Sequence, residues 1–342
     1  MALKTDIYRK LHALKSLPEN AFYLGAIALF VLVILAMLYA SSLFMHNEST
    51  IYDTGRFFAM AKVIVSGATP YLDYQDPKPP LIFFTLTIPV LLGQQFFGGL
   101  LLIGMCNLIS ALVIMQIGRK LYGRFAGLVA GLLFLVNIGW AQGYFVMTEP
   151  FTVLFIVLAT YFALFSEKRH YLVAGLCAGI AIGFKQYALI TVPLLLLALY
   201  LDKETRKMPA FLAGVGIPML VIFGSIFFVY GVQAMDASLY WSFGVAGHYI
   251  ARNKVDPVIS TGTDTFELAL NVIIAVVISA SLYLGYNKFM KNRKPDTVET
   301  YFLLSAVGFS LTLLVRQYLH YWALALPFLA ILWAGWLLKK DR

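Results

Sequence analysis

Apolar runs follow one another along most of this chain, and several are long enough to cross a membrane. A span needs about 20 apolar residues, because the hydrocarbon core is about 30 Å thick and a helix rises about 1.5 Å per residue. Ten runs come near that length: 21–45, 98–118, 124–141, 149–165, 171–184, 187–201, 208–231, 265–287, 300–315 and 321–338. The pattern predicts an all-α polytopic membrane protein with about ten transmembrane helices, in a single domain over residues 1–342.

The composition excludes an ordinary soluble protein. Hydrophobic residues make up 61% of the chain and charged residues only 13%, whereas soluble domains are about half apolar and roughly a quarter charged. No polar stretch is long enough to fold by itself. Cys106 and Cys177 both lie inside apolar runs. We expect them to be small buried side chains rather than a disulfide pair or metal ligands.

Basic residues predict the orientation of the spans. If the N-terminus is cytoplasmic, 19 of the 26 Lys and Arg residues fall in cytoplasmic segments, and the C-terminus is cytoplasmic too. This distribution follows the positive-inside rule. The formal net charge of +9 then reflects membrane orientation, and nucleic acid is not an expected partner. The outer side holds Arg56, Lys62, Lys78, Lys185, Arg252, Lys254 and Arg316.

A further apolar segment, 81–97, does not fit as a span. If it crossed the membrane, every later loop would change sides and the basic residues would face outward. Its flanks, "DPKPP" and "GQQFFGG", are helix breakers that suit a short interfacial or re-entrant helix. The first extracytoplasmic loop is therefore 46–97, and a second large one is 232–264.

The first outer loop gathers charges beside the membrane, in "YDTGRFFAMAKVIVSGATPYLDYQDPKPPL" at 52–81. Residues 54–66 have helical periodicity, with polar and apolar side chains in separate sectors, as in a helix lying flat on a membrane. Gly67 ends this helix, and a turn-rich segment follows. Asp53 lies at its start, so one interpretation is a helix cap and the other is a catalytic carboxylate.

Other ionisable residues are predicted on the same side. Glu149 starts a span, Lys185 ends one, and Arg316 and His320 lie between the last two runs. Ionisable residues at membrane depth usually face the bundle interior or a water-filled cavity, although Lys185 could instead snorkel to the interface. A set of carboxylates and cations at helix ends can bind a phosphate and accept a proton from a hydroxyl.

The second outer loop is long enough for a lid or a binding loop. Its Tyr240, Trp241 and His248 could stack on a sugar, and the alternative is an ordinary interfacial aromatic belt. The spacing of the outer histidines gives no metal-ligand signature. Gly175, Gly179 and Gly183 predict a small-residue face for close helix packing. No P-loop or Rossmann fingerprint is present, so a nucleotide-sugar donor is not supported.

Several motifs together resemble the GT-C class of glycosyltransferases that use polyprenyl-phosphate sugars. The most similar families are the protein O-mannosyltransferases and the lipid A aminoarabinose transferases. The shared features are Asp53 followed by "RFFAMAKVIVSG", then "GATPYLDYQDPKPPL", then "TEP" at 148–150 and a Gly-rich span ending in Lys185. Many relatives have Asp-Glu where this chain has Asp53-Thr54. That missing acid leaves any need for a divalent cation open.

The resemblance implies a role for each matching residue. Asp53 would be the catalytic base, and Glu149 a second acid for the acceptor or a metal. The donor phosphate would lie near the cations Lys78, Arg316, Lys185 and Arg56. Further sugar or lipid contacts are expected from Tyr71, Asp76, Tyr240, Trp241, His248, His320 and Tyr321.

The expected activity follows from these roles. The protein would move a sugar, a hexose or a pentose, from a dolichyl- or undecaprenyl-phosphate donor to a hydroxyl of a glycan, lipid or protein. Transfer would be inverting and would occur on the extracytoplasmic face of a membrane, the small size favouring a prokaryotic plasma membrane. The alternatives are a transporter or flippase for lipid-linked sugars, expected to show an inverted repeat and midplane charges, and a non-catalytic scaffold.

Overall fold

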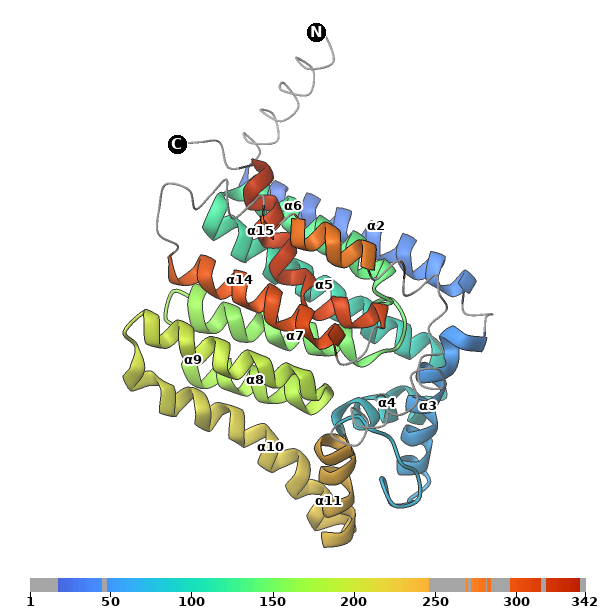
Figure 1. The fold of residues 1–342 in the computed structure, drawn as a ribbon. Coiled ribbons are helices and arrows are strands. Elements are labelled where there is room, and N and C mark those ends of the chain that lie inside the picture. The colour runs from blue at the N-terminus through green and yellow to red at the C-terminus, as the bar shows by residue number, and fades with distance from the viewer. Residues whose placement is uncertain are drawn as a thin grey trace.

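The structure is a computed structural model, and it describes residues 18–44, 48–245, 269, 272–280, 282–283, 296–314 and 318–338. Within these ranges the chain is helical and contains no strand, only an isolated bridge between Pro70 and Tyr74. The all-α prediction is therefore confirmed for the part of the chain that is described. Figure 1 shows the helices gathered into one bundle.

The helices follow the predicted runs. In chain order they are α2 (Glu19–Phe44), α3 (Glu48–Val65), α4 (Leu81–Leu91), α5 (Gln95–Tyr122), α6 (Arg124–Trp140), α7 (Thr148–Thr160) with η1 (Tyr161–Phe165), α8 (Tyr171–Phe184), η2 (Gln186–Ile190), α9 (Thr191–Leu201), η3 (Thr205–Lys207), α10 (Met208–Tyr230), α11 (Val232–Leu239), η4 (Tyr240–Gly244), α14 (Thr297–Ser310), η5 (Leu311–Leu314), η6 (Leu319–Leu324) and α15 (Leu326–Leu338).

Four helical stretches are long and apolar enough to cross a membrane: Glu19–Leu43, Gln95–Tyr122, Thr148–Phe165 and Thr205–Tyr230. Shorter apolar helices coincide with five of the other predicted spans: Arg124–Trp140, Tyr171–Phe184, Gln186–Leu201, Thr297–Leu313 and Leu326–Leu338. The remaining run, 265–287, is described only in part, at 269, 272–280 and 282–283. The count of ten spans and the side of each terminus stay predictions.

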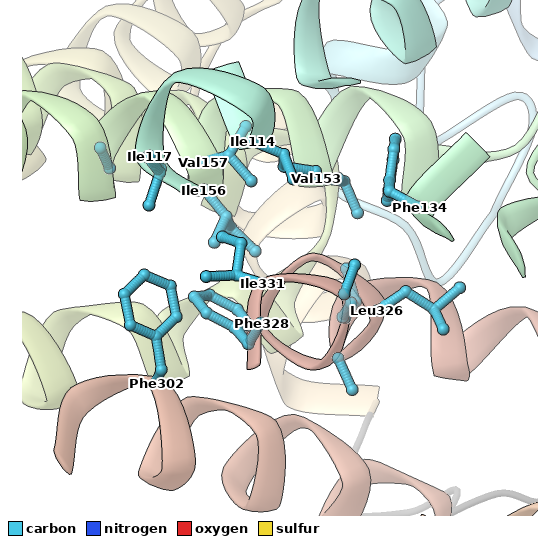
Figure 2. Packing of buried hydrophobic residues seen from close by; sticks show 14 of the residues in the cluster. Ile114, Ile117, Phe134, Val153, Ile156, Val157, Phe302, Leu326, Phe328 and Ile331 are labelled. Atoms are coloured by element: carbon cyan, nitrogen blue, oxygen red, sulfur yellow. The ribbon is translucent and has the colours of Figure 1, made fainter. Parts of the chain in front are cut away.

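The main core lies where α5, α6, α7, α14 and α15 meet. Figure 2 shows Phe328 and Ile331 of α15 facing Ile156 of α7, with Phe302 of α14 beside them. These side chains are almost completely buried. In a bilayer the lipid tails are as apolar as the side chains, so close van der Waals packing holds such helices together.

The predicted small-residue face on α8 is confirmed by its packing against α10. A Cβ added to Gly175 would clash with the carbonyl oxygen of Phe211, and one added to Gly179 would clash with that of Val215. The two backbones therefore approach more closely than side chains larger than hydrogen would allow. This contact fixes the direction of α8 and thus the place of Lys185, which follows its last residue.

The two ends of the bundle differ in their charges. At one end, here called the basic end, Arg119 pairs with Glu19 at 2.6 Å and Arg169 pairs with Asp202 at 2.7 Å. Lys120 donates to the backbone oxygen of Phe165, also at 2.6 Å. The opposite end, here called the loop end, carries α3, α4 and α11, which lie side by side in Figure 1.

The first loop folds onto the bundle rather than lying free. The apolar face of α3, including Phe57 and Met60, is buried, and Phe57 packs edge-on against Phe83 of α4 at 6.0 Å between ring centroids. Protein therefore covers these side chains, and the position of the helix flat on a membrane stays a prediction. The helical periodicity reports the burial of one face without saying whether lipid or protein buries it.

Helix α4 covers the first part of segment 81–97, and α5 begins at Gln95. The 11 residues of α4 extend about 16 Å, roughly half the hydrocarbon thickness, and its interfacial or re-entrant place stays a prediction. Gly93 then adopts a positive φ of 65°, which reverses the chain into α5. The short helix thus brings the chain back to the same end of the bundle, where the loop can pack over the ends of α7 and α8.

Candidate active site

Helix α3 presents Asp53 and Arg56 at the loop end. The helix starts at Glu48, so Asp53 is an interior residue and not its cap, and the capping interpretation is wrong. The Asp53 side chain is half-buried. Arg56, one turn later, pairs with Asp76 at 3.0 Å between Nη2 and Oδ2. Burial raises the pKa of Asp76, while the positive charges of Lys78 and Arg56 act against that rise.

The turn-rich segment between α3 and α4 holds Lys78. The Tyr71 hydroxyl donates to the backbone oxygen of Lys78 at 2.6 Å. Burial raises the pKa of Tyr71 well above its ordinary value, so this hydroxyl keeps the proton it donates. Gln186, at the start of η2, donates to the backbone oxygen of Pro77 at 3.2 Å. Two elements distant in sequence therefore meet at the peptide groups beside Lys78.

Glu149 and Lys185 form a buried ion pair between the first turn of α7 and the end of α8. His320 of η6 lies 3.7 Å from the same carboxylate oxygen. Lys185 Nζ also lies 4.3 Å from the ring centroid of Tyr321, within the range of a cation–π contact. Lys185 is almost fully buried, so the snorkelling interpretation is wrong.

These two groups of charges belong to one site. Asp53 and Lys78 both interact electrostatically with Lys185 and with His320, and Lys78 also interacts with Glu149. The residues come from α3, the following loop, α7, the end of α8 and η6. The structure thus brings together side chains separated by more than half of the sequence.

The remaining predicted residues are placed differently. Tyr71 and Asp76, expected to contact sugar or lipid, are buried within the protein. Tyr240 is exposed, and Trp241 packs partly against the cluster around α3 and α4. Tyr321 is buried beside Lys185. Arg316 and His248 lie outside the described residues.

Three polar residues of the site were missed from the sequence. Gln142 faces His320, with 3.2 Å between Oε1 and Nδ1, and Gln186 anchors Pro77. Thr54 donates to the backbone oxygen of Val146 at 3.2 Å and so joins α3 to the loop before Glu149. The available signal was a polar amide beside an apolar run, which by itself does not say what the amide contacts.

The part of the chain that the structure describes offers no group of three His, Cys, Asp or Glu side chains suited to a metal ion. Cys106 and Cys177 are free and buried, as expected. The groups that do converge are two carboxylates, Asp53 and Glu149, and two lysines, Lys78 and Lys185. Such a set can accept a proton from a hydroxyl and can stabilise a phosphate anion.

The fold and this charged end define a helical membrane protein with a polar site at one end of its bundle. The model of the dolichyl-phosphate-mannose-protein mannosyltransferase family matches residues 77–228, a little under half of the chain. This match confirms the resemblance to the GT-C type of glycosyltransferase. The family consists of membrane glycosyltransferases that use polyprenyl-phosphate sugar donors. No curated protein and no solved structure matches the chain.

The matched segment contains Lys78, Glu149 and Lys185, while Asp53 precedes it. The match therefore covers the cations and the second acid of the site. The carboxylate proposed as the base is linked to them by the geometry described above.

Proposed function

We propose that the protein transfers a single sugar from a polyprenyl-phosphate donor to a hydroxyl acceptor at the loop end of its bundle. The observation that carries this proposal is the convergence of Asp53 and Lys78 with the buried Glu149–Lys185 pair. The donor would be a dolichyl- or undecaprenyl-phosphate hexose or pentose. The acceptor would be a glycan, a lipid or a protein on the extracytoplasmic face of the membrane.

Asp53 would act as the base. Its carboxylate takes the proton of the acceptor hydroxyl as that oxygen attacks the anomeric carbon of the donor sugar. The bond from the anomeric carbon to the phosphate oxygen breaks, and its electron pair stays on the polyprenyl phosphate. A direct displacement of this kind inverts the anomeric centre.

Lys78 would hold the departing phosphate. The leaving group is already an anion, so fixed positive charge stabilises it and no proton donor is needed. Lys185 and Arg56 were also expected to help; Lys185 pairs with Glu149, and Arg56 pairs with Asp76, whose carboxylate Lys78 also influences. In this proposal Lys78 is the principal phosphate ligand among the described residues, and Arg316 keeps its predicted role.

The test compares purified wild type with Asp53→Asn, each given short-chain polyprenyl-phosphate sugars and candidate hydroxyl acceptors. Release of free polyprenyl phosphate is measured. Loss of a positioned general base should lower turnover by roughly 10²–10⁴-fold. Asp236→Asn is the matched control, because Asp236 is an exposed aspartate on α11 at the same end. Equal release by wild type and Asp53→Asn would contradict the assignment of the base.

The alternative of a lipid-linked sugar transporter has a separate readout. Movement of a fluorescent polyprenyl-phosphate sugar across liposomes, without release of free polyprenyl phosphate, would favour it. The charges at the loop end favour the transferase, since a transporter site is expected near the middle of the bilayer.

A further inference from the structure

We propose that Asp76 and Arg56 are positioning residues that hold Lys78 at a fixed separation from Asp53. Neither side chain would touch the donor. The inference rests on the proposed function for the roles of Asp53 and Lys78, and it assigns to Arg56 a role other than binding phosphate.

The first step is the geometry of α3. Asp53 and Arg56 are three residues apart, so they lie on neighbouring positions of one helix face. A group that is fixed to Arg56 is therefore also fixed relative to Asp53. Thr54 anchors the same turn of the helix to the backbone of Val146, which keeps α3 from sliding along the bundle.

The second step is the contact across to the loop. Asp76 is only 2% exposed, and its carboxylate meets Arg56 at 3.0 Å. The backbone N–H of Lys78 also interacts with this carboxylate and favours its charged form. An aspartate that attracts the N–H two residues on is a common way to stabilise a turn, and Pro77 between them restricts the backbone further.

The third step is the opposite side of the same turn. The backbone oxygen of Lys78 accepts from Tyr71, and that of Pro77 accepts from Gln186. Tyr71 itself sits at a positive φ of 68°, an uncommon conformation for a side chain of this size. Two hydrogen bonds thus hold the backbone around Lys78, while the Lys78 side chain is only half-buried.

The charge of Arg56 supports a positioning role. A carboxylate as buried as that of Asp76 costs free energy unless a cation accompanies it. Moving Arg56 onto a phosphate would break its ion pair with Asp76 and leave Lys78 as the other positive charge beside that carboxylate. The Arg56–Asp76 pair is better understood as a clasp between α3, which carries the base, and the loop, which carries the phosphate ligand.

An experiment without ligand tests whether the Arg56–Asp76 ion pair holds the loop against α3. Lys78→Cys introduces a thiol whose rate of modification by a small water-soluble reagent reports how firmly the turn is held. The chain without that substitution gives the background, since Cys106 and Cys177 are buried. Adding Arg56→Gln or Asp76→Asn should raise the rate roughly tenfold, the change that about 1.4 kcal/mol of lost tethering produces.

Two further variants control this measurement. Asp73→Asn alters an aspartate of the same loop that accepts from Thr69 within its own turn, and the rate should change less than about twofold. Arg56→Lys keeps the charge and should restore much of the slow rate. An unchanged rate in Arg56→Gln and Asp76→Asn, in protein that remains folded by size-exclusion chromatography, would overturn the proposal.

Turnover gives the second test, through a double-mutant cycle. If Asp76 acts through Lys78, Asp76→Asn should raise the donor KM more than it lowers kcat. It should also have little further effect in a Lys78→Ala background. Fully additive losses would contradict the positioning role. Absence of turnover in wild type would instead contradict the proposed function, and the labelling rates would still decide on the clasp.

Discussion

The ion pairs at the two ends of the molecule differ in exposure. At the basic end, the Arg119 and Glu19 side chains are 37% and 60% exposed. At the loop end, Lys185 and Glu149 are 2% and 1% exposed. The Arg56–Asp76 pair is intermediate, with 30% for the arginine and 2% for the aspartate. Each pair joins two different segments of the chain, yet the exposed and the buried pairs contribute differently to the free energy of unfolding.

Exposure decides what an ion pair contributes. A solvent-exposed pair contributes about 0–1 kcal/mol, because water screens both charges. A buried pair loses hydration worth several kcal/mol, and its Coulomb attraction only roughly offsets that loss. The buried ion pairs at the loop end therefore add little net free energy of unfolding. They are better explained by the geometry that they impose on the site.

The largest expected effect is at the buried pair. Glu149→Gln removes the counter-charge of Lys185, which then lies buried without a partner. We expect a loss of about 3–5 kcal/mol in the free energy of unfolding. Thermal unfolding of the purified protein in detergent measures it.

A double variant tests whether the loss comes from the unpaired charge of Lys185. Glu149→Gln combined with Lys185→Met removes both charges and should recover more than half of the lost stability, without recovering turnover. A double variant as unstable as the sum of the two single ones would show that the pair itself contributes substantial net stability.

The Arg56–Asp76 pair should respond unequally to removal of its two members. Arg56→Gln removes the ion-pair partner of the buried Asp76 carboxylate, leaving Lys78 as the other positive charge beside it, and should cost about 1–3 kcal/mol. Asp76→Asn leaves an arginine that already reaches solvent and should cost less than half as much. The same unfolding measurement compares them, and equal losses would argue against burial as the cause.

Removal of the exposed pair at the basic end should change both the free energy of unfolding and the turnover least. Glu19→Gln or Arg119→Gln should change the free energy of unfolding by at most about 1 kcal/mol, and less at high salt. Turnover should stay at the wild-type level. A large loss of activity in either variant would mean that the basic end takes part in the reaction.

The stability of the loop end should also depend on pH through Asp76. Burial raises the pKa of Asp76 above its ordinary value of 3.8, so above about pH 4 the folded state binds this proton more tightly than the unfolded chain. The stabilisation of the folded state by the protonated Asp76 carboxyl is therefore complete below its ordinary pKa. It is lost as the pH rises through the raised pKa of the folded state. Wild type should lose more stability than Asp76→Asn between about pH 4 and 7, by less than about 1.4 kcal/mol per pH unit. Identical pH profiles would contradict the raised pKa.

Most of the helices could be predicted from the sequence, because each apolar run reports its own burial. Breakers such as Gly67 and Gly123 end helices locally, through positive φ angles that other residues rarely adopt. The site was predicted less completely. The residue types Asp53, Lys78, Glu149 and Lys185 stood out because ionisable groups are costly beside lipid.

Partner choice could not be predicted, because it depends on how the helices pack. Nothing local in Arg56 distinguishes a phosphate ligand from the partner of Asp76, twenty residues later. Gln142 and His320 meet across 178 positions, a contact that no spacing rule anticipates. The same limit applies to α3, since its periodicity does not say whether its apolar face meets lipid or protein.

The sequence by itself determined that this is a helical membrane protein, where most of its helices run, and that its charges gather near the ends of those helices. These properties follow from local hydrophobicity and backbone preferences. Only the tertiary structure decided which charges neutralise one another. The close approach of α8 and α10 fixes where Lys185 lies, and the fold of the first loop fixes Asp76 against Arg56. Whether an ionisable side chain is paired depends on the burial and electrostatics that packing creates.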